Sequence, residues 1–205
     1  RVFGLIRVAQ TFVATQPNDA RRQQVMLKLV DGLQVMSRNK DLVVACRQYL
    51  ERYGNTPQVA QIEIRLADAL MQTEDLLSAA KAVHAVWKRQ GPNPLGRRYG
   101  LEAINLYCSR LGGEHIKTGA ALAAEMFQRL PNGIFAREVG RRPFEEYYRA
   151  SQWADVVTMG GTLVKRNQFE NTAYRIRVLS GIAHAHGQLQ QYRNAATAHQ
   201  AARNV

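Results

Sequence analysis

The chain has 205 residues, 46% of them hydrophobic, and its 28 lysines and arginines against 16 aspartates and glutamates give a formal net charge of +12. This hydrophobic content is enough for a sizeable core, which excludes an intrinsically disordered chain. Apolar runs reach only about five residues, far below the roughly 18 needed to cross a bilayer, so we expect no transmembrane segment. Helix-forming residues dominate over the six prolines and fifteen glycines, which predicts an all-α protein.

The opening stretch, "RVFGLIRVAQTFVATQPND", has the pattern of the latter part of an amphipathic helix that ends at a Pro-Asn-Asp turn. The first residue is Arg1 rather than a methionine. We therefore expect a fragment of a longer chain, with residues 1–17 as the end of a preceding repeat. A targeting segment would then lie outside this sequence.

Five expected helices share one apolar pattern with spacing i, i+3, i+4, i+7. The second member of each set falls at residue 32, 66, 107, 143 or 182, so the pattern recurs every 34 to 41 residues. Such a period is typical of helical repeat proteins. The sets are Leu29, Gly32, Leu33 and Met36; Glu63, Leu66, Ala67 and Leu70; Ile104, Tyr107, Cys108 and Leu111; Gly140, Pro143, Phe144 and Tyr147; and Leu179, Ile182, Ala183 and His186.

After each of these helices, a polar turn leads to a second helix that opens with a bulky residue three places before a small or slender one. A bulky residue fills the gap between two helices, and a small residue one turn later lets their backbones approach closely. We therefore expect Ala67 and Ala79 to face each other across one helix pair. The bulky and small residues are Leu42 and Ala45, Leu76 and Ala79, Ile116 and Gly119, Trp153 and Val156, and Tyr192 and Ala195.

This arrangement resembles the tetratricopeptide repeat (TPR) family, whose pattern is W-x2-L-G-x2-Y, then A-x3-F, then P. The best match is residues 60–92, with Leu66-Ala67-x2-Leu70 in place of L-G-x2-Y and Gly91-Pro92 at the end. The resemblance implies one domain over residues 1–205, a right-handed superhelical solenoid of antiparallel helix pairs. Its repeats would span about 20–56, 57–93, 95–131, 133–170 and 172–205.

Two segments add detail to this resemblance. Pro143 would kink a helix over residues 134–149, unless that helix starts near Arg141 with the proline in its first turn; we favour the kink. The stretch "RYGNTPQVAQIEIRLADAL" is similar to the tyrosine-proline turn and alanine-rich helix of bacterial envelope TPR lipoproteins. That similarity implies a periplasmic or cell-envelope scaffold or assembly factor.

Catalytic and cofactor motifs are absent: there is no G-x-G-x-x-G, G-x-x-x-x-G-K-[ST], H-E-x-x-H, G-x-S-x-G or C-x-x-C. His184 and His186 are two residues apart on a helix and point in different directions, which disfavours a shared metal. Glu145 and Glu146 are adjacent and are expected on a solvated face. We therefore expect no enzyme, no cofactor and no metal site.

Cysteines and aromatic residues fit packing roles. Cys46 and Cys108 lie in apolar stripes, where free cysteines behave as small hydrophobes. The aromatic residues are at helix-packing spacings, so we expect them in the core rather than in contact with nucleic acid bases. They are Trp87, Trp153, Tyr107, Phe127 and Phe144.

The positive charge is concentrated at the two ends, because residues 1–56 carry +5, residues 57–94 carry 0 and residues 172–205 carry +4. This distribution disfavours nucleic acid, which would call for a basic stripe interleaved with aromatics. We expect a protein-interaction scaffold without catalytic activity, because helical repeat arrays present extended binding surfaces. Binding of an anionic polysaccharide or nucleic acid, or a role as the helical accessory domain of an enzyme, remain the alternatives.

The repeat register also predicts which side chains line the concave surface, since they should flank the apolar stripe of each first helix. Arginine can pair bidentately with a carboxylate, and asparagine can hold a peptide backbone. We therefore expect an extended, acidic protein segment as the ligand. The alternative is that the arginines only pair with Asp68 and Glu145 on neighbouring helices. The predicted partner-binding residues are Arg65, Asp68, Asn105, Arg141, Glu145, Arg177 and His184.

Overall fold

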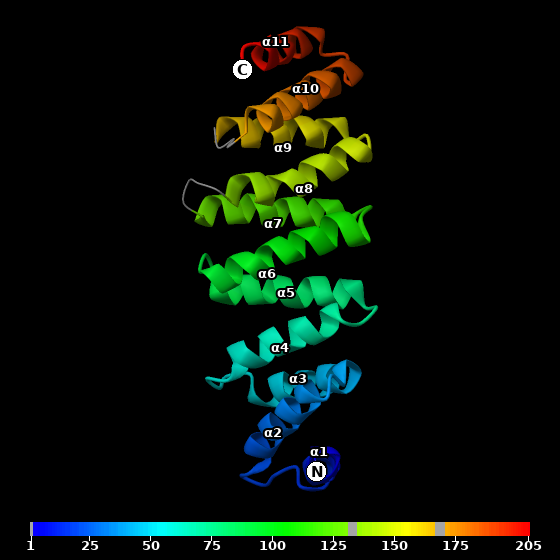
Figure 1. Ribbon diagram of the computed structural model, residues 1–205, viewed down its shortest axis with the longest axis vertical. Helices are drawn as coiled ribbons and strands as arrows, with labels where there is room; N and C mark the ends of the chain where they lie inside the picture. Colours follow the sequence, from blue (N-terminus) through cyan, green and yellow to red (C-terminus); the bar gives the residue numbers. More distant parts are fainter. Residues whose placement is uncertain (1, 131–134, 167–170) are drawn as a thin grey trace. The chain divides into compact units, whose positions relative to one another are not determined.

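The structure is a computed structural model that describes residues 2–130, 135–166 and 171–205. These residues form eleven α-helices and one short π-helix, packed as sequential antiparallel pairs, with no strand among them (Figure 1). The all-α prediction and the prediction of antiparallel helix pairs are therefore confirmed. Among the described helices, none has both the length and the apolar character needed to cross a bilayer.

The chain divides into two compact units, residues 1–90 and residues 91–205. In the first unit each helix packs against the next along the chain. Its core includes the fully buried side chains of Val30, Tyr49, Ile62 and Trp87. The helices of this unit are α1 (Val2–Thr15), α2 (Arg22–Val35), α3 (Asn39–Tyr53), α4 (Val59–Met71) and α5 (Leu76–Gln90).

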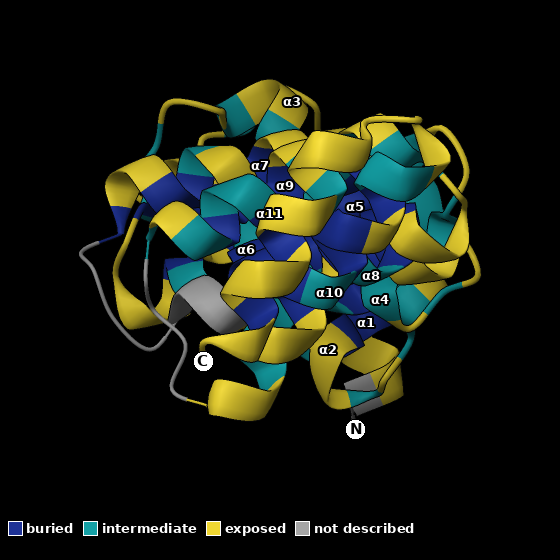
Figure 2. Cartoon of the chain, turned by 90° about the horizontal axis from the view of Figure 1, so that it is seen from above, coloured by how far each residue is buried: buried dark blue, intermediate teal, exposed yellow. Residues whose placement is uncertain are grey.

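In the second unit, helices also pack in chain order, and α6 additionally contacts α8. Most helices have a buried stripe and an exposed one, as the burial colours of Figure 2 show. The elements are α6 (Pro94–Asn105), η1 (Leu106–Leu111), α7 (His115–Arg129), α8 (Phe135–Arg149), α9 (Trp153–Lys165), α10 (Thr172–Gln188) and α11 (Tyr192–Arg203). The single domain over 1–205, its repeat boundaries and the handedness of a superhelix stay predictions.

Small residues lie where the sequence predicts close helix packing. Ala67 of α4 and Ala79 of α5 are both fully buried, and these two helices pack against each other. Gly119 of α7 lies so close to η1 that a β-carbon on it would overlap the sulfur of Cys108 and come within 3.2 Å of Tyr107 Cβ. Any larger residue at position 119 would therefore require the Cys108 side chain or the two helices to shift.

The π-helix is a feature that the sequence pattern did not predict. It continues α6 directly, and its last turn closes with the Gly112 N–H donating to the Tyr107 carbonyl at 3.1 Å. A π turn accommodates one extra residue compared with an α turn. Its position coincides with the longest step of the repeat pattern, the 41 residues between Leu66 and Tyr107.

Three helix pairs are joined by turns of one geometry. In each turn a residue with positive φ lies two places before the second helix, and the next residue donates its N–H to the carbonyl five residues back at 2.8 to 3.0 Å, as in a Schellman cap. The residues with positive φ are Ser37 (52°), Ser151 (55°) and Gln190 (58°).

These turns correct part of the predicted packing. The second helix begins at Asn39 in the first of these pairs, at Trp153 in the next and at Tyr192 in the last. Leu42 is therefore one helical turn further into its helix than Trp153 or Tyr192, so the predicted Leu42 and Ala45 pair does not lie at the equivalent position. Tyr192 was expected to fill a gap between helices, but it is 70% exposed. That expectation is wrong, because the start of α11 lies at the surface.

Helix α8 continues on both sides of Pro143, so the alternative start near Arg141 is wrong. Proline has no N–H, and therefore the carbonyl of Val139 loses its usual helical partner four residues on. Pro143 and Val139 both lie on the buried side of α8. A kink at Pro143 stays a prediction.

Candidate partner-binding surface

One face of α8 carries a row of charged side chains between α6 and α10. Glu138, Arg142, Glu145 and Arg149 are spaced three or four residues apart, which places them on one side of the helix. The first two line a cleft with α6, and the last two line a groove with α9, α10 and α11. This face of α8 therefore connects two hollows within the second unit.

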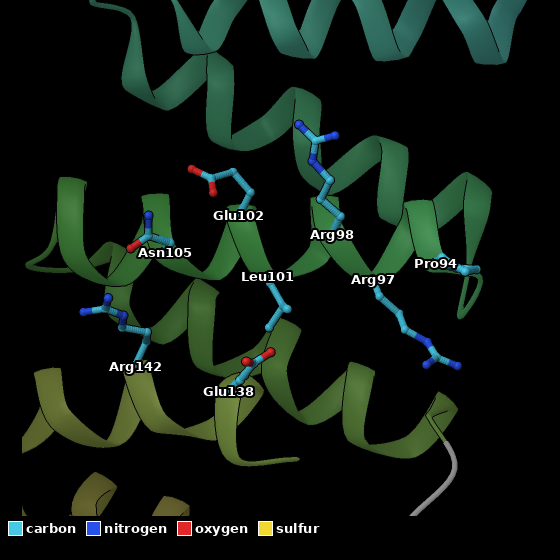
Figure 3. Close-up of a pocket in the computed structure, with 8 residues that line it drawn as sticks. All are labelled: Pro94, Arg97, Arg98, Leu101, Glu102, Asn105, Glu138 and Arg142. Carbon is cyan, nitrogen blue, oxygen red and sulfur yellow. The ribbon is translucent and has the colours of Figure 1, made fainter. Parts of the chain in front are cut away.

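The cleft between α6 and α8 has a volume of about 630 Å³. Figure 3 shows Leu101 of α6 pointing toward Glu138 of α8, whereas Arg98 and Glu102 point away from α8. Arg142 lies below Asn105 at one end of the cleft (Figure 3). Three arginines and two glutamates line this cleft, so it carries both signs of charge.

The groove on the other side of α8 has a volume of about 800 Å³ and contains a cluster of three rings. We call it the ring groove; it is defined by Tyr148 at the end of α8, Trp153 at the start of α9 and His184 of α10, together with Glu145 and Arg177. The ring centroids lie 5.2 Å apart for Trp153 and His184, and 5.6 Å apart for Tyr148 with either of the other two. Rings at these separations are in mutual contact. The cluster therefore offers an aromatic surface rather than a cage that encloses a ligand.

Glu145 forms ion pairs with two arginines at this groove. One of its carboxylate oxygens, Oε1, accepts from Arg141 Nε at 3.0 Å and lies 3.9 Å from Arg177 Nη1. Its side chain is only 11% exposed, whereas that of Arg177 is 67% exposed. Two guanidinium groups thus share one carboxylate, and Arg177 holds the longer contact.

Glu146 lies deeper in the same helix. Its Oε1 accepts from Ser109 Oγ of η1 at 3.3 Å, and its Oε2 pairs with Arg149. Glu146 is buried and Glu145 is largely so, which corrects the expectation of a solvated face for this pair. The two adjacent carboxylates bind different partners, since Glu145 contacts α10 through Arg177 and Glu146 contacts η1 through Ser109.

The structure gathers three of the predicted binding residues around one groove, namely Glu145, Arg177 and His184. Arg141 is joined to them through its hydrogen bond to Glu145, and Asn105 lies in the cleft on the other side of α8. The pairing of arginines with Glu145, considered as an alternative from the sequence, is present. A ligand carboxylate at Arg177 must therefore compete with Glu145.

The two remaining predicted residues belong to the first unit. Arg65 of α4 donates to Asp31 of α2 through Nη1 and Oδ1 at 2.6 Å. Asp68 is half-buried on the same helix. An arginine and a carboxylate thus join the first helices of successive pairs in both units, through Arg65 and Asp31 here and through Arg177 and Glu145 in the second unit.

Sequence reasoning missed two members of the ring groove, Tyr148 and Trp153. Trp153 was expected in the core, but it is half-buried and contacts His184 at the rim of the groove. A tyrosine and a tryptophan five residues apart across a turn were the available signal. The other aromatics assigned to the core are fully or almost fully buried, as predicted: Trp87, Tyr107, Phe127 and Phe144.

The described residues include no group of three or more His, Cys, Asp or Glu side chains that could hold a metal ion. His184 contacts the ring cluster, whereas His186 lies 2.7 Å from Gln191 Oε1 through its Nδ1, so the two histidines face different surroundings. Cys46 and Cys108 are free and buried. Burial raises the pKa of each thiol to about 12, which keeps both protonated at neutral pH.

No protein-family model and no curated protein matches this chain. Among solved structures, the chain is similar to one described as the crystal structure of BtubC (BKLC) from P. vanneervenii, with 14% sequence identity and a TM-score of 0.47. The likeness covers 99% of this chain and 87% of that one. A likeness of this size says nothing about activity or partners.

Proposed function

We propose that the chain is a non-catalytic interaction module whose ring groove binds an extended protein segment. The observation that supports this most directly is the cluster of Tyr148, half-buried Trp153 and His184 beside Arg177 in the ring groove. Aromatic surfaces with an arginine at their edge are typical of protein-binding hot spots. The TPR resemblance points to the same class, since its helix pairs present extended binding surfaces.

The chemistry of the groove favours a segment in which an acidic residue is next to an apolar one. The ring cluster would bury the apolar side chain, and the carboxylate would pair with Arg177, which has only the longer contact to Glu145. The ligand residue would have to approach along the exposed side of Tyr148, which is 38% accessible. Binding would thus combine apolar contact with one charged anchor.

The mixture of positive and negative side chains in the cleft and the groove supports a protein ligand over an anionic polymer. Glu102 and Glu138 lie among the arginines of the cleft, and Glu145 lies between Arg141 and Arg177. A polysaccharide or nucleic acid would meet repulsion at each glutamate, whereas a protein segment can present both signs of charge. A periplasmic or cell-envelope scaffold is the setting that the resemblance to envelope TPR proteins implies.

The test begins with selection of binding peptides from a random display library, followed by affinity measurements on purified variants. Arg177→Glu and the double change Tyr148→Ala with His184→Ala should each weaken binding about tenfold or more, near 1.4 kcal/mol. Arg193→Glu is the matched control, because Arg193 is an exposed arginine at the start of α11. That change should leave affinity within about twofold.

Salt dependence separates the two ligand classes. A single charged anchor predicts a shallow dependence on salt concentration, with a slope of about −1 in a plot of log K against log salt, whereas a polyanion that contacts many arginines gives a much steeper slope. Equal affinity for the groove variants and the native chain would contradict the proposed site. Tight, steeply salt-dependent binding of heparin, lost in Arg177→Glu, would contradict the proposed ligand class.

A further inference from the structure

Helix α1 is apolar on two sides. Ile6 and Val13, seven residues apart, are buried against α2, and the Ile6 side chain lies only 3.1 Å from where a β-carbon on Gly32 would stand. A second stripe, formed by Leu5, Val8 and Phe12 at spacing i, i+3, i+7, lies beside that contact. Leu5 and Val8 are 69% and 68% exposed. A helix that is apolar on both sides normally has both sides covered.

The second stripe of α1 forms one wall of a groove of about 650 Å³, which we call the α1–α2 groove. The other wall is a row on α2 with spacing i, i+3, i+7, i+10: Val25, Lys28, Gly32 and Val35. Val35 is 76% exposed at the end of this row. The walls and floor are therefore almost entirely apolar.

Basic residues form the rim of this groove. Lys28 is exposed on α2, and Arg21 lies at the start of the same wall, where it pairs with Asp19 at 2.9 Å. Arg7 of α1 lines an adjoining hollow together with Arg21. The one acidic residue in the groove, Asp31, is bound to Arg65 at 2.6 Å. The rim therefore presents net positive charge to an occupant.

A segment bound in this groove must form its backbone hydrogen bonds within itself. Both walls are α-helices of fourteen residues, whose N–H and C=O groups are bonded within each helix. An extended segment buried here would find no backbone partners, and each unpaired group is costly. A helix satisfies its backbone internally, and about 14 residues would match the roughly 20 Å length of the walls.

The geometry points to a second binding site, independent of the ring groove: the α1–α2 groove docks an amphipathic helix whose apolar stripe is flanked by acidic residues. The apolar stripe covers Leu5, Val8 and Val35, and the acidic flank lies against Lys28. This is the helix-in-groove mode of recognition, read by apolar anchors at i, i+3, i+4 and i+7.

The probe is a synthetic helical peptide of about 18 residues, with leucines at i, i+3, i+4 and i+7 and glutamates on both flanks. A second peptide carries the same leucines with lysine flanks. Anisotropy of labelled peptides should show that the 205-residue chain binds the glutamate peptide at least tenfold more tightly than the lysine peptide. Equal binding of the two peptides would overturn the charge part of the inference.

Variants locate the site. Leu5→Asp with Val8→Asp should weaken the glutamate peptide at least tenfold, with unchanged circular dichroism because both side chains are exposed. Tyr192→Asp is the matched control, since Tyr192 is 70% exposed on α11, and it should leave binding within twofold. Lys28→Glu should weaken the glutamate peptide and strengthen the lysine peptide, each about threefold, which changes their ratio about tenfold.

Three outcomes would overturn the proposal. If neither peptide binds, or if Leu5→Asp with Val8→Asp binds as the native chain does, the groove does not dock such a helix. If sedimentation shows a dimer that the same double change dissociates, the occupant is a second copy of this chain instead. Arg177→Glu should not alter peptide binding here, so failure of this site is distinguishable from failure of the ring groove.

Discussion

Helices α1 and α11 make a useful comparison, because each packs against one neighbouring helix, α1 against α2 and α11 against α10. The side of α11 that faces away from α10 is polar, with exposed Arg193, Asn194, Thr197 and Gln200. On α1, by contrast, Leu5 and Val8 are exposed beside α2. The two helices thus differ in what they expose, because α1 has an accessible apolar stripe that a partner could cover and α11 has a polar one.

The largest expected effect concerns thiol reactivity, with one buried cysteine in each unit. Burial raises the pKa of Cys46 and Cys108 from 9.0 to about 12, so at pH 8 each thiolate is about a thousandfold rarer in the folded than in the unfolded chain. Labelling with iodoacetamide should be suppressed accordingly. The protection is complete below pH 9 and declines as pH rises toward 12.

Rapid labelling of Cys46 alone would mean that the first unit, which contains α1, opens more readily than the second unit, which contains α11. Mass spectrometry of the labelled peptides separates the two sites. Equal protection of both thiols would show that the apolar side of α1 does not weaken its unit.

The second prediction separates the two sides of α1. Ile6→Ala removes a buried side chain and should lower the free energy of unfolding by about 2 to 4 kcal/mol. Leu5→Ala, on the exposed side, should change it by less than about 0.5 kcal/mol. Urea denaturation measures both. A large effect of Leu5→Ala would mean that the exposed stripe is already covered within this chain.

The third prediction compares a helix with neighbours on both sides to α11. Ala67 is fully buried on α4, which packs against both α3 and α5. Ala67→Leu should cost about 1 to 3 kcal/mol through overpacking. Ala201→Leu, at an exposed position of α11, should cost less than about 0.5 kcal/mol. Equal melting temperatures for the two variants would contradict close packing of α4 on α5.

The smallest expected effect concerns the turn before α11. Gln190 has a φ of 58°, which glycine adopts with less strain, so Gln190→Gly should stabilise the chain by about 0.5 kcal/mol. Ala196→Gly within α11 is the control, and it should destabilise by about 1 kcal/mol because glycine is a poor helix former. Thermal melts that shift in the same direction for both variants would rule out strain at Gln190.

The periodic positions predicted much of the local structure. Apolar periodic positions on the first helix of several pairs are buried: Leu29, Leu33, Ala67 and Ile104. Apolar residues at this spacing share one side of the helix, and that side packs into the core. The π-helix could not be predicted, since one extra residue leaves no mark in a pattern read with an α-helical period. The first bulky and small pair was placed one turn out of register for a similar reason, as the turn at Ser37 decides where α3 begins.

For the candidate site, the sequence predicted which helices carry the charged residues, but it did not predict what surrounds each side chain. Glu145, Arg177 and His184 were predicted from repeat register, and they line one groove. Tyr148 and Trp153 were missed as groove residues, because an aromatic residue near a helix end has the same local pattern whether it is buried or half-exposed.

Helix propensity and apolar spacing act over a few neighbouring residues, and they are enough to predict an all-helical chain arranged as helix pairs. The three-dimensional contacts were needed to show that two arginines share Glu145, that Glu146 is buried, and that three rings from α8, α9 and α10 meet in one groove. Each of these features depends on a contact between residues more than 30 positions apart in the chain: Glu145 with Arg177, Glu146 with Ser109, and Tyr148 with His184. Their contacts depend on how successive helices cross, and side-chain packing between helices sets that angle rather than any local pattern.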